Sequence, residues 1–254
     1  MNWRGFLAIC AIVLATNANA QANLLNATIP EEVGVKTVEQ MAADNDKPLP
    51  YGYIDDRDIL WSKVVWEYID LNEKINLPFY YPVDTNNIGS NRRSLYDTLL
   101  RGIKNGEIVD VYDDSYFENK LSMTDIRGRM SRIDTSDAGI ELLNAGEVLT
   151  DEYIDRRDLT AGDITGLKIK GVWYFDKRQG ELKYRLLGIA PVAPFVNFID
   201  SEGSADELIE LFWVWYPGAR EITHDMKVFN RRYSAFPLSY DHLLNARRFV
   251  ASIY

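Results

Sequence analysis

The pattern of hydrophobic and polar positions predicts helices in the first part of the chain. Winding residues Asp58 to Ile75 at about 100° per residue gathers apolar side chains on one side and charged side chains on the other. Residues Ser94 to Asn105 repeat this arrangement, and Gly106 follows where a helix C-terminal cap is expected. The sequence therefore predicts two amphipathic helices, the first of which ends before Pro78.

One aromatic residue does not fit the first of these helices. Trp66 falls in the middle of the polar side, where the core of the same domain would not cover it. Either a loop or the N-terminal arm covers this side chain, or the side chain anchors a partner protein. The aromatic pair Tyr80-Tyr81 lies at the corner after the helix, and we take Trp66, Tyr80 and Tyr81 as candidates for one contact surface.

The period of the pattern changes to two after residue 166. Apolar residues alternate with polar ones in residues 167–176 and again in residues 181–188, with a short polar turn between the two runs. Antiparallel pairing that sets Trp173 opposite Tyr184 and Phe175 opposite Leu182 brings these apolar side chains to one face. The sequence thus predicts a β-hairpin with a defined register.

The remaining segments complete the predicted fold. Residues 119–166 are polar and predict short helices and loops, Ile209 to Tyr216 predicts a strand buried on both faces, and Ser239 to Tyr254 predicts a C-terminal helix. Helices, then strands, then a helix indicate an α+β domain. In this fold amphipathic helices are followed by an antiparallel sheet built on the central hairpin, with a helix at the C-terminal end.

The first twenty residues have the features of a secretory signal peptide. Arg4 precedes an apolar run that is too short to cross a bilayer, and Ala18 and Ala20 have the small-residue spacing that signal peptidase accepts. We expect cleavage after Ala20, followed by an extended arm or linker over residues 21–50 and a folded domain over residues 51–254. Cys10 lies within the apolar run behind the bulky Ile9, which argues against lipid attachment.

Composition and charge restrict the classes of function. The 254 residues include 46% hydrophobic and 26% charged residues, which is typical of a globular protein. Cleavage after Ala20 removes Arg4 and no acidic residue, which leaves 27 basic and 38 acidic side chains and no cysteine. This negative charge argues against nucleic-acid binding, because that binding relies on Lys and Arg neutralising phosphates.

The sequence contains no motif that predicts a catalytic, cofactor-binding or metal site. It has no nucleophile elbow, zinc-binding helix or Walker loop. Asp110, Asp113 and Asp114 could hold a cation or supply a pair of glycosidase-type carboxylates, although such clusters in an acidic chain are usually solvated surface. We therefore expect that the protein is not an enzyme. The alternative is a periplasmic protein that binds or hydrolyses the glycan of peptidoglycan.

Paired arginines are further candidates for contacts with a partner. Arg231-Arg232 and Arg247-Arg248 are each followed directly by an aromatic residue. Arginine beside aromatic rings suits protein interfaces or acidic polymers, because the guanidinium group is planar and stacks. Ordinary surface ion pairs explain the four residues equally well.

Separated blocks that run from about Asp55 to the C-terminus carry a family resemblance. They are DILWSKVVW (58–66), IDLNEKIN (69–76), YYP (80–82), SL (94–95), GEI (106–108), IKGVWYFDK (169–177), GIAP (188–191), LFWVWYP (211–217), VFN (228–230) and RRF (247–249). In this order they closely resemble the GldN/PorN family of gliding-motility proteins. The chain departs from the family pattern at Gly171, where an acidic residue is expected, and in residues 21–50, which show no match.

The resemblance implies a non-enzymatic periplasmic subunit of the type IX secretion system, which exports proteins across the outer membrane in Bacteroidetes and supports gliding. It implies assembly with an outer-membrane lipoprotein of the GldK/PorK type, self-association in a ring, and contact with a periplasmic motor shaft of the GldM/PorM type. The protein would lie in the periplasm at the inner face of the outer membrane, held there by the lipoprotein, with no membrane span of its own.

Overall fold

The computed structural model of the protein describes residues 46–84, 92–146, 150–195, 208–228 and 238–254. The chain divides into two compact units, of which the first, Met1–Lys47 with Asn87–Asn91, lies almost wholly outside the described residues. The expected signal peptide and most of the expected arm also lie outside them. The second unit, Pro48–Asn86 with Arg92–Tyr254, contains the fold.

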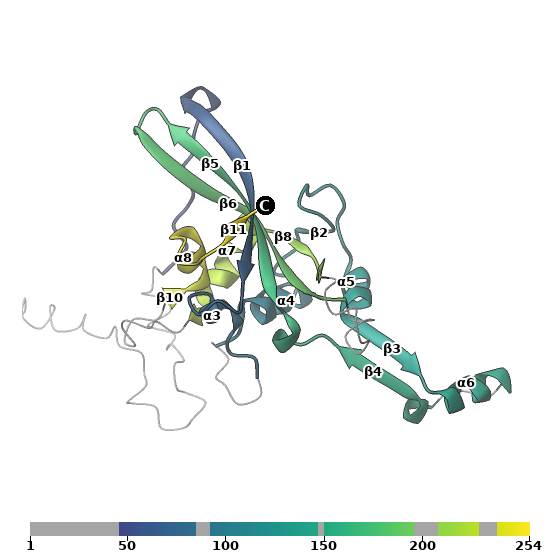
Figure 1. The fold of residues 1–254 in the computed structure, drawn as a ribbon. Helices are drawn as coiled ribbons and strands as arrows, with labels where there is room; N and C mark the ends of the chain where they lie inside the picture. The colour runs from purple at the N-terminus through teal and green to yellow at the C-terminus, as the bar shows by residue number, and fades with distance from the viewer. Residues whose placement is uncertain (1–45, 85–91, 147–149, 196–207, 229–237) are drawn as a thin grey trace, which may run out of the picture. The chain divides into compact units, whose positions relative to one another are not determined.

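An antiparallel sheet forms the centre of the second unit (Figure 1). Its strands run in the order β11–β1–β5–β6–β8–β2, and β7 also pairs with β6. The strands are β1 (Ile59–Asp70), β2 (Val111–Tyr112), β5 (Gly166–Asp176), β6 (Glu181–Pro194), β7 (Leu208–Glu210), β8 (Trp213–Trp215) and β11 (Ser252–Ile253).

Short helices and two small hairpins surround this sheet. The helices are α3 (Leu77–Tyr80), α4 (Leu95–Lys104), α5 (Met123–Met130), α6 (Asp137–Asn144), α7 (Tyr216–Asp225) and α8 (Tyr240–Asn245). The hairpins are β3 (Ser131–Thr135) with β4 (Ile154–Asp158), and β9 (Lys227–Val228) with β10 (Leu238–Ser239). Single 3-10 turns lie at Asp56–Asp58, Asp151–Tyr153 and Ala161–Asp163. The α+β class predicted from the sequence is confirmed.

The predicted central hairpin is confirmed, together with its register. Trp173 pairs with Tyr184 and Phe175 with Leu182, as the alternation of apolar residues indicated. The pairing continues to Val192, with one extra residue, Leu187, in β6 where the register shifts. The two strands are longer than the predicted ones and form the middle of the sheet.

The predicted helix over Asp58 to Ile75 is wrong, because Ile59–Asp70 is the strand β1. β-branched and aromatic residues dominate this segment and favour a strand. Its second half is covered on both faces, so apolar residues occupy both faces and the alternation of period two is hidden. Trp66 is therefore a strand residue, half-buried and paired with Lys170 of β5.

Two further elements differ from the prediction in their extent. Residues Ile209 to Tyr216 form the two short strands β7 and β8 rather than one, and Pro217 lies in the first turn of α7 instead of leading out of a strand. The predicted C-terminal helix begins as expected, with the Ser239 side chain accepting a hydrogen bond from the His242 amide at 3.1 Å. It ends at Asn245, and the chain then turns back to form β11 against β1.

The same capping turn ends α4 and α8 with different residues. At the end of α4 the amides of Glu107 and Gly106 donate to the carbonyls of Gly102 and Ile103, and Gly106 has a φ of +76°. This confirms Gly106 as the predicted cap.

At the end of α8 the amides of Arg248 and Arg247 donate to Leu243 and Leu244 in the same pattern, with Arg247 at a φ of +50°. A residue other than glycine rarely adopts this conformation, and contacts with its surroundings must offset the backbone strain.

An ion pair with a buried carboxylate compensates for this backbone conformation. The Arg247 guanidinium donates to both carboxylate oxygens of Glu67 at 2.8 and 2.9 Å, and Glu67 is 2% exposed. The guanidinium also lies over the rings of Tyr184 and Trp173, at 4.3 and 5.3 Å from their centroids. Paired and stacked in this way, Arg247 fixes the C-terminal turn against the middle of the sheet.

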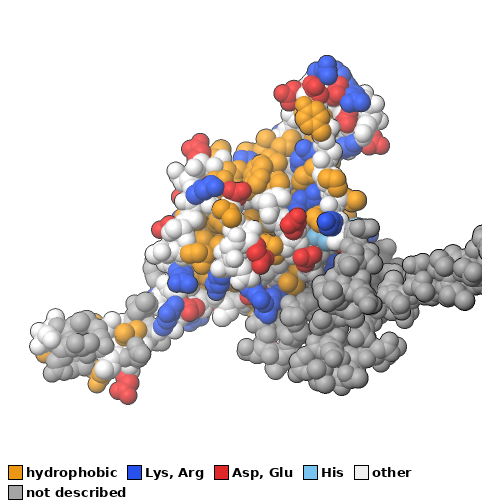
Figure 2. Space-filling model, turned by 180° about the vertical axis from the view of Figure 1, so that it is seen from behind, with side chains coloured by type: hydrophobic (Ala, Val, Ile, Leu, Met, Phe, Trp, Pro, Cys, Tyr) orange, Lys and Arg blue, Asp and Glu red, His pale blue; other side chains and the backbone are white. Residues whose placement is uncertain are grey.

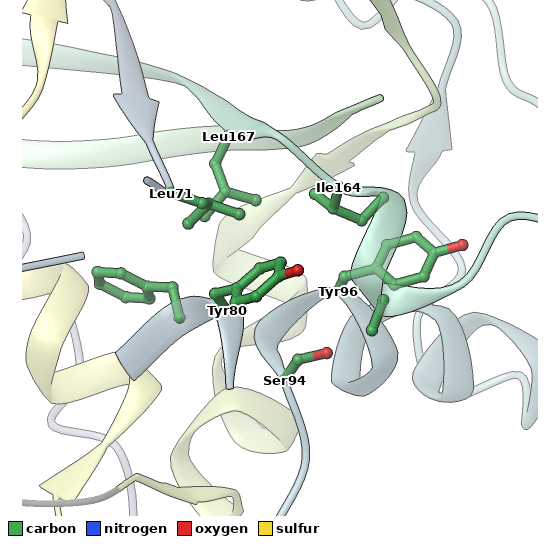
Figure 3. A pocket seen from close by; sticks show the side chains of 8 residues that line it. Leu71, Tyr80, Ser94, Tyr96, Ile164 and Leu167 are labelled. Carbon is green, nitrogen blue, oxygen red and sulfur yellow. The ribbon is translucent and has the colours of Figure 1, made fainter. Parts of the chain in front are cut away.

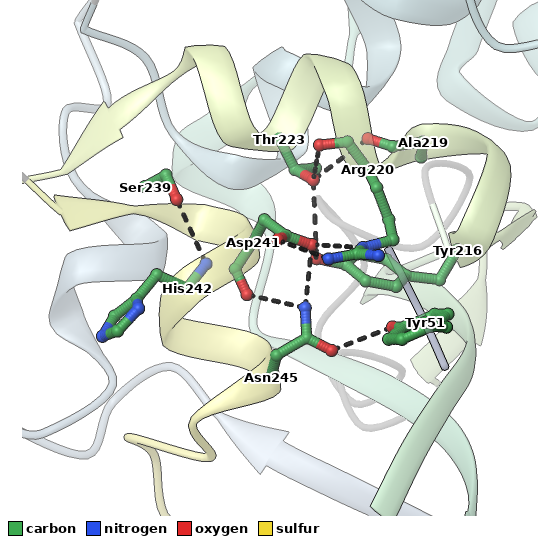
Figure 4. A network of polar contacts seen from close by, with 9 residues as sticks. All are labelled: Tyr51, Tyr216, Ala219, Arg220, Thr223, Ser239, Asp241, His242 and Asn245. Atoms are coloured by element: carbon green, nitrogen blue, oxygen red, sulfur yellow. Dashed lines mark hydrogen bonds and ion pairs between the residues drawn. The ribbon is translucent and has the colours of Figure 1, made fainter. Parts of the chain in front are cut away.

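A second buried network joins α7, α8 and the beginning of the fold (Figure 4). Arg220 donates to both oxygens of Asp241 at 2.8 and 3.0 Å, and the Tyr216 hydroxyl donates to the same carboxylate at 3.0 Å. The Tyr51 ring stacks against Arg220 at 4.1 Å, and its hydroxyl donates to Asn245. Burial raises the pKa of Tyr51 to about 12.

Replacing Arg247 by Met tests the first network. The Glu67 carboxylate would remain buried without a cation, so we expect the free energy of unfolding to fall by about 3–5 kcal/mol. Lys120→Met is the control, because Lys120 and Asp110 form an exposed pair at 2.9 Å whose loss should change the stability far less. Denaturant unfolding measures both changes, and equal losses would contradict a special role for the buried pair.

Tyrosine ionisation tests the second network. The pKa of Tyr51 is about 12 in the folded protein and about 10 in an unfolded chain, so the folded state binds the hydroxyl proton more tightly than the unfolded state does. Its contribution to stability is present below pH 10 and is lost as the pH rises from about 10 to 12. Tyr51→Phe should reduce this alkaline loss, whereas Tyr53→Phe, at a residue that is 90% exposed, should leave it unchanged. Thermal unfolding measured over this pH range distinguishes the two variants.

Candidate interaction surface

One row of neighbouring residues crosses four strands of the sheet. Trp66 of β1 pairs with Lys170 of β5, Lys170 with Gly188 of β6, and Gly188 with Trp215 of β8. Direct partners in adjacent strands point to the same face of a sheet. Gly188 has no side chain, so the middle of this row is open for another group.

Phe117 fills the open position above Gly188. A Cβ atom at position 188 would lie 2.5 Å from Cζ of Phe117, so only glycine fits. The Phe117 ring meets those of Tyr112 and Trp215 edge to face, at centroid distances of 5.4 and 5.0 Å. Phe117 has a φ of +63°, which is rare for an aromatic residue.

The loop that carries Phe117 is held by its own carboxylates. Asp114 Oδ1 accepts hydrogen bonds from the amides of Tyr116 and Phe117 at 2.8 and 3.1 Å. The Asp113 carboxylate forms an ion pair with Arg129, and Asp110 forms one with Lys120. These contacts give each of the three candidate carboxylates a structural role in the loop.

The same loop covers Trp66 and Lys170. Lys170 Nζ donates to the Ser115 carbonyl at 2.6 Å and lies 5.1–5.3 Å from the ring centroids of Trp66, Tyr116 and Phe117. The Trp66 indole donates to the Ser115 hydroxyl at 3.1 Å, and burial lowers the pKa of Lys170. We call Trp66, Tyr116, Phe117 and Lys170 the lysine–aromatic cluster. Tyr116 is its exposed member, at 67%, whereas the other three are partly buried.

The sequence pointed to only one member of this cluster. Trp66 attracted attention because it did not fit a helix, and a covering loop was one of the two explanations. Tyr116, Phe117 and Lys170 were missed, because they lie about 50 or more residues further along the chain and no local pattern links them to Trp66.

The Tyr80-Tyr81 corner forms a separate feature. The two rings meet edge to face at 4.9 Å, and the Tyr80 hydroxyl donates to the Gly162 carbonyl at 3.1 Å. Figure 3 shows the Tyr80 ring packed between Leu71 and Ser94, whereas Tyr81 is 56% exposed. The corner lines a surface cavity of about 300 Å³, whose other lining residues are Leu71, Asn72, Leu77, Gly162, Ile164 and Thr165.

The four arginines singled out in the sequence have different positions. Arg247 is turned inward onto Glu67, whereas Arg248 is exposed. Arg231 and Arg232 lie outside the described residues. Of the two arginines that the structure describes, Arg248 is therefore the one whose side chain is presented to a partner.

A comparison with protein families identifies the chain. The model for "Gliding motility associated protein GldN" matches residues 54–254. The chain belongs to the GldN family. A search among curated proteins found no match.

The family match includes both parts of the candidate surface. Residues 54–254 include the lysine–aromatic cluster and the Tyr80-Tyr81 corner. In the part of the chain that the structure describes, no helix is long and apolar enough to cross a bilayer. A search of the same residues found no cluster of three His, Cys, Asp or Glu side chains with the geometry of a metal site.

The departure from the family pattern at Gly171 has a structural reason. A Cβ atom at this position would lie 2.1 Å from the Tyr184 hydroxyl oxygen, so the ring occupies the space of any side chain. Tyr184 in turn stacks on Arg247, which pairs with Glu67.

Gly188→Ala tests the packing of the loop over the sheet. The added methyl group would displace Phe117, so residues 113–119 should exchange their amide hydrogens faster and Trp66 should become more accessible. Gly128→Ala is a matched control, since no atom lies within 4 Å of its added Cβ. Hydrogen exchange measured by mass spectrometry reports on the loop, and equal protection in both variants would contradict this packing.

Proposed function

We propose that the protein is a non-enzymatic structural subunit of the periplasmic ring of the type IX secretion system. In this role it supports protein export across the outer membrane and gliding motility. The observation that carries the proposal is the match of residues 54–254 to a gliding-motility family. The structural use of Asp110, Asp113 and Asp114 supports it, because these residues were the basis of the hydrolase alternative.

The proposal includes three protein contacts. An outer-membrane lipoprotein of the GldK/PorK type holds the subunit at the inner face of the outer membrane, copies of the subunit associate in a ring, and the ring meets a GldM/PorM-type motor shaft. A ring requires two different patches on each subunit, because each copy meets its two neighbours through different surfaces. The lysine–aromatic cluster and the Tyr80-Tyr81 corner are our candidates for one of these patches.

The surface of the corner suits a protein contact. Tyr81 is exposed beside a cavity of about 300 Å³, and aromatic residues next to cavities are common anchors of interfaces. Arg248 adds an exposed guanidinium group. Neither side chain belongs to the buried core, so both can be changed without unfolding the protein.

Co-purification from outer-membrane extracts tests the function. The tagged protein should retain a lipoprotein partner in stoichiometric amount, and Tyr81→Ala should reduce this amount several-fold while its melting temperature stays within about 2 °C of the wild type. Tyr53→Ala, at a more exposed tyrosine outside the corner, is the control. Recovery of the wild-type protein only as a free monomer, or hydrolysis of purified peptidoglycan that is lost in Asp113→Asn, would overturn the proposal.

A further inference from the structure

The outer edge of β1 is only partly occupied. β11 pairs with Glu67 and Tyr68, and the Tyr254 amide donates to the Trp66 carbonyl at 3.3 Å. From Leu60 to Val65, no strand within the described residues pairs with this edge. In the part of the chain that the structure describes, six residues of β1 therefore present an open edge.

The direction of the backbone groups along this edge follows from two hydrogen bonds. The Trp66 carbonyl points outward to Tyr254, whereas the Leu71 amide points inward to Thr165 beside β5. In an antiparallel strand, alternate residues direct both their N–H and their C=O groups to the same side. The register of β1 with β5 is regular from Trp61 to Asp70, so Ser62 and Val64 direct these groups outward.

The side chains at this edge are unusually apolar for solvent-exposed positions. Leu60, Trp61 and Val64 are 69%, 50% and 40% exposed. A lysine commonly protects an edge strand from pairing, and Lys63 occupies that position here. Figure 2 shows that charged side chains of both signs surround the projecting end of the unit at the upper right. Along the edge from Leu60 to Val64, Lys63 is the one charged residue among mainly apolar side chains.

We propose that this edge pairs with the same edge of a second copy across a two-fold axis centred on Ser62. In that register Ser62 faces Ser62, Lys63 faces Trp61, and Val64 faces Leu60 of the other copy. The outward N–H and C=O groups of the two Ser62 residues then form inter-strand hydrogen bonds, and Val64 lies opposite Leu60, where the register of β1 with β5 shifts. Lys63 of each copy then lies against the exposed indole of Trp61 of the other copy. Because an ammonium group is attracted to an aromatic ring, the lysine favours this pairing and does not prevent it.

The neighbouring registers are less favourable. Centring the axis on Lys63 would set two ammonium groups opposite each other in a close pair. Centring it on Val64 would place the second copy's Ser62 opposite Trp66, where Tyr254 already lies.

This contact is separate from the ring contact of the proposed function. A two-fold contact is complete with two subunits and does not propagate, so it cannot by itself close a larger ring. It would join subunits in pairs, either before assembly or between two layers. Its failure would therefore leave the ring proposal untouched, and the reverse also holds.

Position-specific disulfide formation tests the register. In the full chain with Cys10→Ser, Ser62→Cys supplies the only thiol, and antiparallel hydrogen-bonded partners have Cα atoms about 5.5 Å apart, within reach of a disulfide. Val64→Cys is the matched control, because the two copies of residue 64 would be four residues apart along the strands, about 13 Å. Mild oxidation should convert Ser62→Cys into a reducible dimer and leave Val64→Cys monomeric. Equal cross-linking of both variants, or none in either, overturns the proposal.

An exchange of residues tests the pairing of Lys63 with Trp61 in the absence of cross-linking. The wild-type chain should have the mass of a dimer in light scattering. Trp61→Lys should make it monomeric, because lysines would then face each other, and the added change Lys63→Trp should restore the dimer. A monomeric wild-type chain, an unaltered dimer in Trp61→Lys, or a Ser62→Cys adduct with a different protein in place of the homodimer would each contradict the inference.

Discussion

The rest of the structure depends on the buried carboxylate of Glu67. It lies on β1 at 2% exposure, where an unpaired negative charge would be strongly unfavourable. Arg247 satisfies both of its oxygens, and this contact holds the backbone of Arg247 at a positive φ. Because that conformation ends α8, the chain reverses there and β11 returns to β1. One ion pair thus determines where the last helix ends and how far the outer edge of β1 is covered.

The two faces of the sheet are covered in different ways. Glu67, Arg247 and the helices cover one face, whereas the loop over residues 113–119 covers the other. On the second face the decisive feature is the missing side chain at Gly188, which admits Phe117 and with it the loop. The loop then shields Lys170 and most of Trp66 but leaves Tyr116 exposed. The part of this face that a partner could reach is therefore defined by a glycine at its centre.

The comparison of α4 with α8 shows what the sequence could and could not predict. Both helices end in the same hydrogen-bonded turn. Gly106 made the turn after α4 predictable from the sequence. Arg247 did not do so for α8, because its stabilising partner lies 180 residues away. The β5–β6 register was predictable since its apolar alternation is local. The strand β1 was not, since both of its faces are covered in its second half. Likewise, Trp66 stood out in the sequence, but its neighbours in the lysine–aromatic cluster come from distant segments.

The distance along the chain between Glu67 and Arg247 also constrains the order in which the domain folds. β1 cannot complete its side of the sheet until β5 is available about a hundred residues later, and the charge of Glu67 is not neutralised until residue 247 arrives. A chain that emerges from its N-terminal end therefore acquires its stabilising long-range contacts late, as expected for a fold of high contact order. Until then β1, with its aromatic edge, remains unpaired, and this is the stage at which the polypeptide is most exposed to aggregation and to proteases.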